Sequence, residues 1–174
     1  MRTSRAGFTL VELMIVVAIV GILAVVAMFG YRAIIASSKT AEPRQVLGSI
    51  RLAQEAYKAE TGSYANITGG AVCPSDGTTG KKWGWQPTCG GGATWAALTV
   101  NPDGPVMFGY STESGIFGGA FNPSPTVNSI AIPTNAPAGT TGAGYWAFAT
   151  GDPGAGPVKM LTSSLSKEII TAEP

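Results

Sequence analysis

The chain contains no histidine and few charged residues. Asp, Glu, Lys and Arg make up 12% of its 174 residues, against about 25% in an average soluble domain. Without histidine, the most common general base and metal ligand is missing, and neither a Ser-His-Asp nor a Cys-His catalytic arrangement can form. A formal net charge of +1 does not favour nucleic acid or an acidic surface as partner. We therefore expect no enzyme, no cofactor and no bound metal.

The glycine-rich segments also lack the spacing of phosphate-binding loops. Gly80–Lys82 is not followed by Ser or Thr and has no glycine five residues earlier, as a P-loop requires. In Gly139–Gly144 the glycines are wrongly spaced for a dinucleotide loop. Gly151–Gly154 faintly resembles a calcium loop but carries one aspartate, whereas Ca²⁺ takes about 6–8 oxygen ligands.

Cysteine is scarce, with only Cys73 and Cys89. Two cysteines without histidine are too few ligands for a zinc site. If the chain crosses a membrane into an oxidising compartment, a disulfide is expected. Closing the loop of roughly 15 residues would add about 3 kcal/mol of stability in the loop-entropy model. Two free buried thiols are the alternative.

A long apolar run is present near the N-terminus. Leu13–Tyr31 holds 19 residues without a charge and would span about 28 Å as a helix, enough to cross a bilayer. Arg2 and Arg5 would hold the N-terminus in the cytoplasm. A cleaved signal peptide fits poorly, because the run is too long and no small-x-small site follows it. A plain anchor leaves Glu12 unexplained, since a carboxylate at a membrane helix centre costs roughly 2.5–3.5 kcal/mol.

The segment Arg5–Glu12, which reads Arg-Ala-Gly-Phe-Thr-Leu-Val-Glu, closely resembles the processing site of type IV prepilins and the related pseudopilins. The resemblance extends to about Ala27. It implies that a membrane peptidase cuts after Gly7 and that the new N-terminus, Phe8, is N-methylated. It also implies that Glu12 neutralises the N-terminal amine of a neighbouring subunit in a filament, which fits the need of a carboxylate in a dry site for an opposite charge. The alternative is an interfacial glutamate favoured by the helix dipole.

The chain departs from the family at two places. Many pilins carry a proline where this chain has Phe29, followed by Gly30. Proline kinks a helix, whereas glycine only weakens it by about 1 kcal/mol relative to alanine. In many pilins the cysteine pair lies near the C-terminus. In this chain it lies before the predicted sheet.

The remaining pattern predicts an α+β, pilin-like fold: a long N-terminal helix with an apolar first half, packed on a C-terminal antiparallel β-sheet. An apolar stripe runs along the second half of the helix, with a bend near Glu42 before Pro43 and a stop at Gly62. The stripe consists of Val46, Leu47, Ile50, Ala53 and Tyr57. Residues 95–98 suggest a helical turn. Strands are expected at Val106–Tyr110, Gly115–Phe121, Val127–Ile132, Gly144–Thr150 and Val158–Thr162.

These elements divide the chain into four expected parts. They are a leader peptide at 1–7, a transmembrane and assembly helix at 8–31, an amphipathic half-helix at 32–62 and a loop-and-sheet region at 63–174. In the loop, Lys81, Lys82, Trp83 and Trp85 form a candidate surface-binding group, because lysines beside tryptophans can stack on bases or sugars. Covering a small loop core is the alternative for these tryptophans.

The resemblance implies a structural subunit of a type IV pilus or pilus-like filament. Its implied partners are other copies or other pilins in a helical filament, the prepilin peptidase and N-methyltransferase, the inner membrane and the pilus assembly machinery. The precursor would be a single-pass inner-membrane protein with a cytoplasmic N-terminus, and the assembled filament would be extracellular or periplasmic. The alternatives are a minor or competence pilin that binds DNA or a surface, and a type II secretion pseudopilin.

Overall fold

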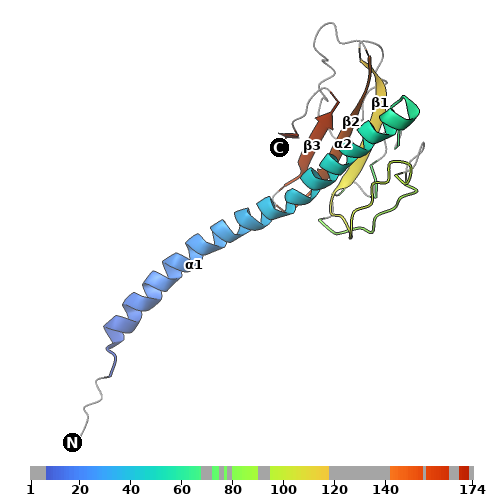
Figure 1. Cartoon of the computed structure of the whole chain (residues 1–174). Coiled ribbons are helices and arrows are strands. Elements are labelled where there is room, and N and C mark those ends of the chain that lie inside the picture. The colour runs from blue at the N-terminus through green and yellow to red at the C-terminus, as the bar shows by residue number, and fades with distance from the viewer. Residues whose placement is uncertain are drawn as a thin grey trace, which may run out of the picture. The chain divides into compact units, whose positions relative to one another are not determined.

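The computed structural model describes residues 7–67, 72–74, 77, 80–89, 95–117, 142–154, 156–164 and 169–172, apart from the side chains at 32, 33, 36, 116, 117 and 172. The chain divides into two compact units, Met1–Ser38 and Lys39–Pro174 (Figure 1). The predicted strand at Val127–Ile132 lies outside the described residues, as do residues 1–6 of the predicted leader peptide.

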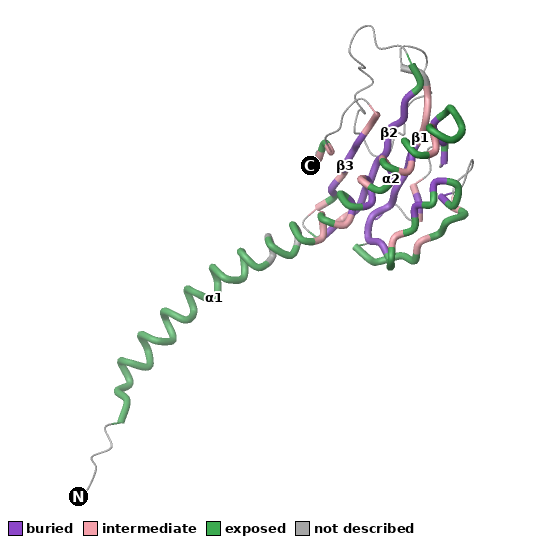
Figure 2. Tube along the Cα trace, viewed as in Figure 1, coloured by how far each residue is buried: buried purple, intermediate pink, exposed green. Residues whose placement is uncertain are grey.

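The first unit is built on one helix, α1 (Leu10–Lys39), of 30 residues. Its apolar side chains point in every direction around the axis, and Figure 2 colours its described residues as exposed almost throughout. The helix continues without interruption through Phe29 and Gly30. Helix α1 is therefore regular at this point, as expected for phenylalanine followed by glycine, because neither interrupts a helix as proline does.

The second helix, α2, runs from Ala41 to Thr61 and is separated from α1 by Thr40. Pro43 explains the interruption, because it has no N–H to donate to the carbonyl of Lys39 and is tolerated only in the first turn of a helix. At the other end, Gly62 adopts a left-handed conformation with φ 81° and donates its N–H to the Lys58 carbonyl at 2.8 Å. The predicted stop at Gly62 is confirmed.

Four strands form one antiparallel sheet in the order β1-β2-β3-β4. They are β1 (Gly109–Phe117), β2 (Gly142–Gly151), β3 (Val158–Ser163) and β4 (Ile170–Ala172). The meander confirms the predicted α+β class with an antiparallel sheet. Strand β2 is buried from Gly144 to its end, because its side chains alternate between two apolar clusters. Ala147 and Ala149 belong to one cluster, and Trp146 and Phe148 belong to the other.

The strands predicted at Val106–Tyr110 and Gly115–Phe121 both overlap one strand, β1, and residues 118–121 lie outside the described residues. Val106 forms only an isolated bridge with Trp83, and the strand begins at Gly109 and continues through the polar stretch Ser111–Ser114. The sequence suggested two strands there because polar residues separate the apolar ones. Thr112 is nevertheless buried, and its Oγ1 donates to the Trp146 carbonyl at 2.9 Å, which satisfies the hydroxyl inside the sheet. Strand β4 was not predicted, although it lies in a short β-branched stretch.

Helix α2 packs across one face of the sheet over β2 and β3 (Figure 1). The predicted stripe is confirmed, since Val46, Leu47 and Ile50 are buried and Ala53 and Tyr57 pack against the same core. The core on the sheet side includes Tyr110, Ala147, Ala149, Val158 and Met160. The predicted turn after Trp95 is also present, and Trp95 and Leu98 are buried in this core.

A buried amide of α2 reinforces this packing. Gln54 is fully buried, and its Nε2 donates to the Ala65 carbonyl at 2.8 Å and to Thr112 Oγ1 at 3.0 Å. Its Oε1 accepts the Ala65 N–H at 2.9 Å. The Gln54 side chain therefore hydrogen-bonds both backbone groups of Ala65, in the segment that follows α2. It also links this segment to Thr112 in β1.

The disulfide between Cys73 and Cys89 is present, with Cα atoms 5.9 Å apart. Cys73 also pairs with the edge of β1, because its N–H donates to the Tyr110 carbonyl at 2.9 Å and its carbonyl accepts the Tyr110 N–H at 2.7 Å. The disulfide therefore ties the loop at 80–89 to the edge of the sheet.

Candidate processing and assembly site

Gly7 and Phe8 lie before the first turn of α1 and are exposed. The side chain of Phe8 is 91% exposed. A Cβ atom added to Gly7 would meet no atom within 4 Å, and the residue does not have the positive φ that would require glycine. The fold of this chain therefore gives no reason for glycine at position 7.

Thr9 and Glu12 form a capping box at the start of α1. The Thr9 backbone N–H donates to Glu12 Oε2 at 2.9 Å, and Thr9 Oγ1 donates to the same oxygen at 2.8 Å. In return, the Glu12 backbone N–H donates to Thr9 Oγ1 at 3.2 Å. Two backbone donors that a helix start leaves without intrahelical partners are satisfied in this way.

The capping box gives Glu12 a local role that sequence reasoning missed. The signal was in the chain, because Thr-x-x-Glu before an apolar run is the pattern of this motif. Both contacts from Thr9 reach Oε2. The carboxylate is therefore oriented by the start of its own helix.

The helix that follows is long and apolar enough to cross a membrane. The stretch Leu10–Tyr31 has 22 residues, and an 18-residue window within it has a mean hydropathy of 3.0. Its large apolar side chains are between 53% and 74% exposed. A helix that is apolar all round needs an apolar environment on every side, which lipid or other helices can supply.

Part of the chain is similar to known proteins. Residues 2–28 match the family model described as the prokaryotic N-terminal methylation motif. The type IV major pilin protein PilA of Myxococcus xanthus is 42% identical over 72 residues, and the type IV major pilin protein PilE of Neisseria gonorrhoeae is 42% identical over 79 residues. The chain thus matches a prokaryotic N-terminal methylation motif and is similar over part of its length to type IV major pilins. No solved structure matches it.

The similarity to these pilins is partial in length. The match to PilA covers 38% of this chain and 33% of that protein, and the match to PilE covers 45% and 42%. A type IV major fimbrial protein FimA of Dichelobacter nodosus is 38% identical over 86 residues, which is 47% of this chain and 55% of that protein. The chain thus spans about half or less of the length of these relatives.

The four residues of the candidate surface-binding group are not equivalent. Lys81, Lys82 and Trp83 are exposed, and the side chain of Trp83 is 40% exposed. Trp85 is half-buried, with its ring centroid 5.2 Å from that of Trp95 and 5.9 Å from that of Tyr110. Trp85 therefore covers the core, which was the alternative for these tryptophans, and the surface group consists of the other three residues.

The single aspartate of the loop Gly151–Gly154 has a conformational role. Asp152 Oδ1 accepts the N–H of Gly154 at 2.7 Å and that of Gly156 at 3.3 Å. This arrangement stabilises the turn between β2 and β3. Among the described residues, no group of three or more Cys, Asp or Glu side chains is placed to hold a metal ion.

Proposed function

We propose that the chain is the structural, non-enzymatic subunit of a type IV pilus. The precursor is inserted in the inner membrane through α1, with its N-terminus in the cytoplasm. A prepilin peptidase cuts after Gly7 and Phe8 is N-methylated. The mature chain then polymerises with other pilins through α1, with help from the pilus assembly machinery. The observation that carries this proposal is the Gly7-Phe8 junction directly before a capped helix whose stretch Leu10–Tyr31 is long and apolar enough to cross a membrane.

The proposal assigns a role to each part of the chain. Residues 1–7 are the leader peptide, 8–31 the membrane and assembly segment, 32–62 the amphipathic half-helix, and 63–174 the loop-and-sheet region. Residues 39–174 fall within a compact unit with its own core. That unit would form the outer part of the filament, which is extracellular after assembly.

Burial of apolar surface supplies the driving force for assembly. Once Leu10–Tyr31 leaves the bilayer, each exposed apolar side chain favours contact with another helix at about 25 cal/mol per Å². Contacts of this kind that do not close on themselves produce helical filaments. A bundle of such helices can keep the stretch out of water in the filament as lipid does in the precursor.

Glu12 sets the register of this assembly. Cleavage after Gly7 creates an amine at Phe8, and a neighbouring subunit can bring its own amine to the Glu12 carboxylate. In a dry bundle an unpaired carboxylate is costly, whereas a paired one fixes a single axial alignment. Thr9 already holds Oε2, so the carboxylate meets the incoming amine in a defined orientation.

The names of the relatives favour a shaft subunit over the other members of the family. The relatives described above are named as major pilin or major fimbrial proteins. A minor or competence pilin and a type II secretion pseudopilin share the same N-terminal segment and remain the alternatives. Asp152 does not support the pseudopilin alternative through a calcium loop, because its carboxylate accepts a hydrogen bond from Gly154 in its own turn.

N-terminal sequencing and intact mass of the membrane-extracted protein test the proposal. We expect a chain that starts at methylated Phe8, and we expect Gly7→Val to leave the precursor uncut. Gly48→Val is the matched control, because Gly48 also has open space around its Cβ position and lies far from the junction. Processing should be normal in this control. A wild-type chain that still carries residues 1–7 would refute the proposal.

A further inference from the structure

An open groove of about 690 Å³ runs between α2 and the loop Leu98–Val106. Its apolar lining includes Val46 and Ala53 from the helix and Leu98, Val100 and Val106 from the loop. This volume lies within the roughly 300–1,000 Å³ of typical ligand sites, so the groove can receive a large side chain together with its neighbours.

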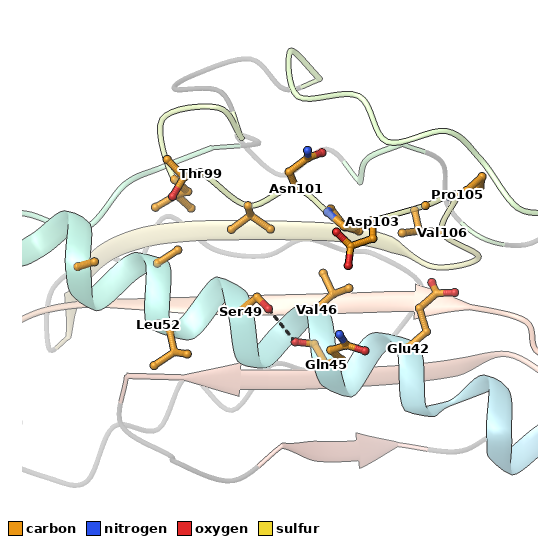
Figure 3. A pocket seen from close by; sticks show the side chains of 16 residues that line it. Glu42, Gln45, Val46, Ser49, Leu52, Thr99, Asn101, Asp103, Pro105 and Val106 are labelled. Carbon is orange, nitrogen blue, oxygen red and sulfur yellow. Dashed lines mark hydrogen bonds between the residues drawn. The ribbon is translucent and has the colours of Figure 1, made fainter.

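The charged residues that line the groove are both acidic. They are Glu42 on α2 and Asp103 on the loop. In Figure 3 the Asp103 carboxylate points from the loop toward α2, and the Glu42 carboxylate points from α2 toward the loop. No lysine or arginine is among the residues that line this groove. The groove therefore favours an apolar partner that carries positive charge.

The Glu42 carboxylate already accepts hydrogen bonds from its own chain. Its Oε1 accepts the backbone N–H groups of Met107 at 2.8 Å and Phe108 at 3.3 Å, and the hydroxyl of Tyr110 at 3.2 Å. Asp103 is exposed at the rim of the groove. Asp103 is consequently the carboxylate that can meet a cation from outside.

A complementary segment lies on the loop at 80–89. Lys81, Lys82 and Trp83 are consecutive and exposed, and residues 80–89 contain no acidic side chain. The backbone of Trp83 is fixed, because its N–H donates to the Val106 carbonyl at 2.7 Å and its carbonyl accepts the Val106 N–H at 2.8 Å. The segment therefore presents an indole and two ammonium groups on a supported backbone.

The two lysines are not placed to pair with Asp103 of their own chain. The bridge between Trp83 and Val106 is antiparallel. Lys82 therefore lies on one side of the bridged pair, and Asp103 lies on the other side. A second copy of the chain can approach Asp103 without this restriction.

We propose that the acidic groove of one subunit receives Lys81, Lys82 and Trp83 of a second copy of this chain. The indole contacts the apolar lining, and a lysine pairs with Asp103. The groove and the segment are different surfaces, so the contact is heterologous, and its repetition extends an open assembly. This inference rests on the proposed function and adds to it a contact between the outer units of neighbouring subunits.

Zero-length carbodiimide cross-linking of assembled filaments tests the contact. Filaments are grown from an equal mixture of ¹⁴N- and ¹⁵N-labelled chains, and cross-linked peptides are analysed by mass spectrometry. We expect amide links between Lys81 or Lys82 and Asp103 in mixed-isotope pairs, which only contacts between subunits can produce. Links found only in same-isotope pairs would overturn the proposal.

Charge reversal gives a second measurement. Asp103→Lys should lower the yield of assembled filament at least about tenfold, because like charges at an interface are strongly unfavourable. Adding Lys81→Asp and Lys82→Asp in the same chain should restore most of the yield. Glu60→Lys is the matched control, since Glu60 is exposed on α2 and does not line the groove.

The outcomes separate this inference from the proposed function. Filaments that assemble without the mixed link and tolerate Asp103→Lys would overturn the contact and leave the pilus subunit intact. A processed chain that never forms filaments would overturn both. DNA binding that is lost in Lys81→Ala/Lys82→Ala, without any mixed link, would assign the segment to nucleic acid and overturn the contact.

Discussion

The two consecutive helices distribute their apolar residues in opposite ways. In α1 the large apolar side chains of Leu10–Tyr31 surround the axis and are all more than half exposed. In α2 the apolar residues form one stripe, and Val46, Leu47 and Ile50 are buried against the sheet. The difference shows which contacts each segment encodes, because α2 finds its partner within the chain and α1 requires partners from outside.

The polar groups of the two helices follow the same division. Glu12 in α1 is bonded to Thr9, only three positions away. In α2, Gln54 bonds to Thr112 and Glu42 bonds to Met107, 58 and 65 positions away. The start of α1 is therefore self-contained, whereas α2 depends on the folded sheet for its polar partners.

Removing α1 should have the largest effect. We expect a chain that begins at Ser38 to be a soluble, folded monomer that forms no filaments, because the core lies within Lys39–Pro174. Sedimentation and electron microscopy measure assembly, and urea denaturation measures folding. The full-length processed chain is the control. A shortened chain that is unfolded, or that still assembles, would break the comparison between the two helices.

Gln54→Leu should strongly destabilise the second unit. The substitution leaves the N–H and carbonyl of Ala65 without their partner and removes one partner of Thr112, all inside the core. We expect the free energy of unfolding to fall by about 3 kcal/mol. Urea denaturation of the chain beginning at Ser38 provides the measurement.

The exposed Gln45 on the same helix supplies the control for this substitution. Gln45→Leu should change the free energy of unfolding by no more than about 0.5 kcal/mol. Equal effects of the two substitutions would mean that the hydrogen bonds of Gln54 contribute little to the attachment of α2 to the sheet.

The sequence was most informative where local rules decide the structure. The spacing of Val46, Leu47 and Ile50 predicts the buried stripe, and Gly62 predicts the helix stop. The apolar strand around Trp146 was also predicted, since β-formers flanked by glycine indicate a strand. The capping box of Thr9 and Glu12 was equally local and could have been predicted from its spacing.

The remaining features depend on contacts that are distant in sequence. Nothing near Gln54 or Glu42 indicates that their partners are residues of β1 and the segment before it. The buried Thr112 reads as a polar interruption until its bond to the Trp146 carbonyl is known. The local pattern also does not show that Trp83 is exposed while Trp85 packs against the core, because the fold decides which indole contacts the core.

Thr9→Ala should weaken the start of α1 by a smaller amount. Loss of the hydroxyl removes two of the three capping-box bonds and should cost about 1 kcal/mol of helix stability at this end. Amide hydrogen exchange of Leu10–Leu13 in detergent micelles measures the effect. Thr9→Ser is the matched control, because it keeps the hydroxyl and should retain slow exchange. Unchanged exchange in Thr9→Ala would show that the hydroxyl does not stabilise the helix start.

Tyr145→Phe should have the smallest effect at neutral pH and a clear one at alkaline pH. The Tyr145 side chain is fully buried, and its hydroxyl has no hydrogen-bond partner among the described residues. Removing the hydroxyl should therefore leave stability at pH 7 unchanged or slightly increased, since no bond is lost.

At alkaline pH the buried hydroxyl reduces stability. Burial raises the pKa of Tyr145 above its usual value of 10, and the nearby Glu55 and Tyr64 raise it further. The unfolded chain therefore loses this proton at a lower pH than the folded chain, so the free energy of unfolding falls as the pH rises above 10. Burial and Glu42 raise the pKa of Tyr110 in the same direction. In Tyr145→Phe the decline between pH 10 and 11 should be shallower but still present, as urea denaturation at each pH would show. A slope identical to that of the unsubstituted chain would mean that Tyr145 ionises in the folded unit as it does in water.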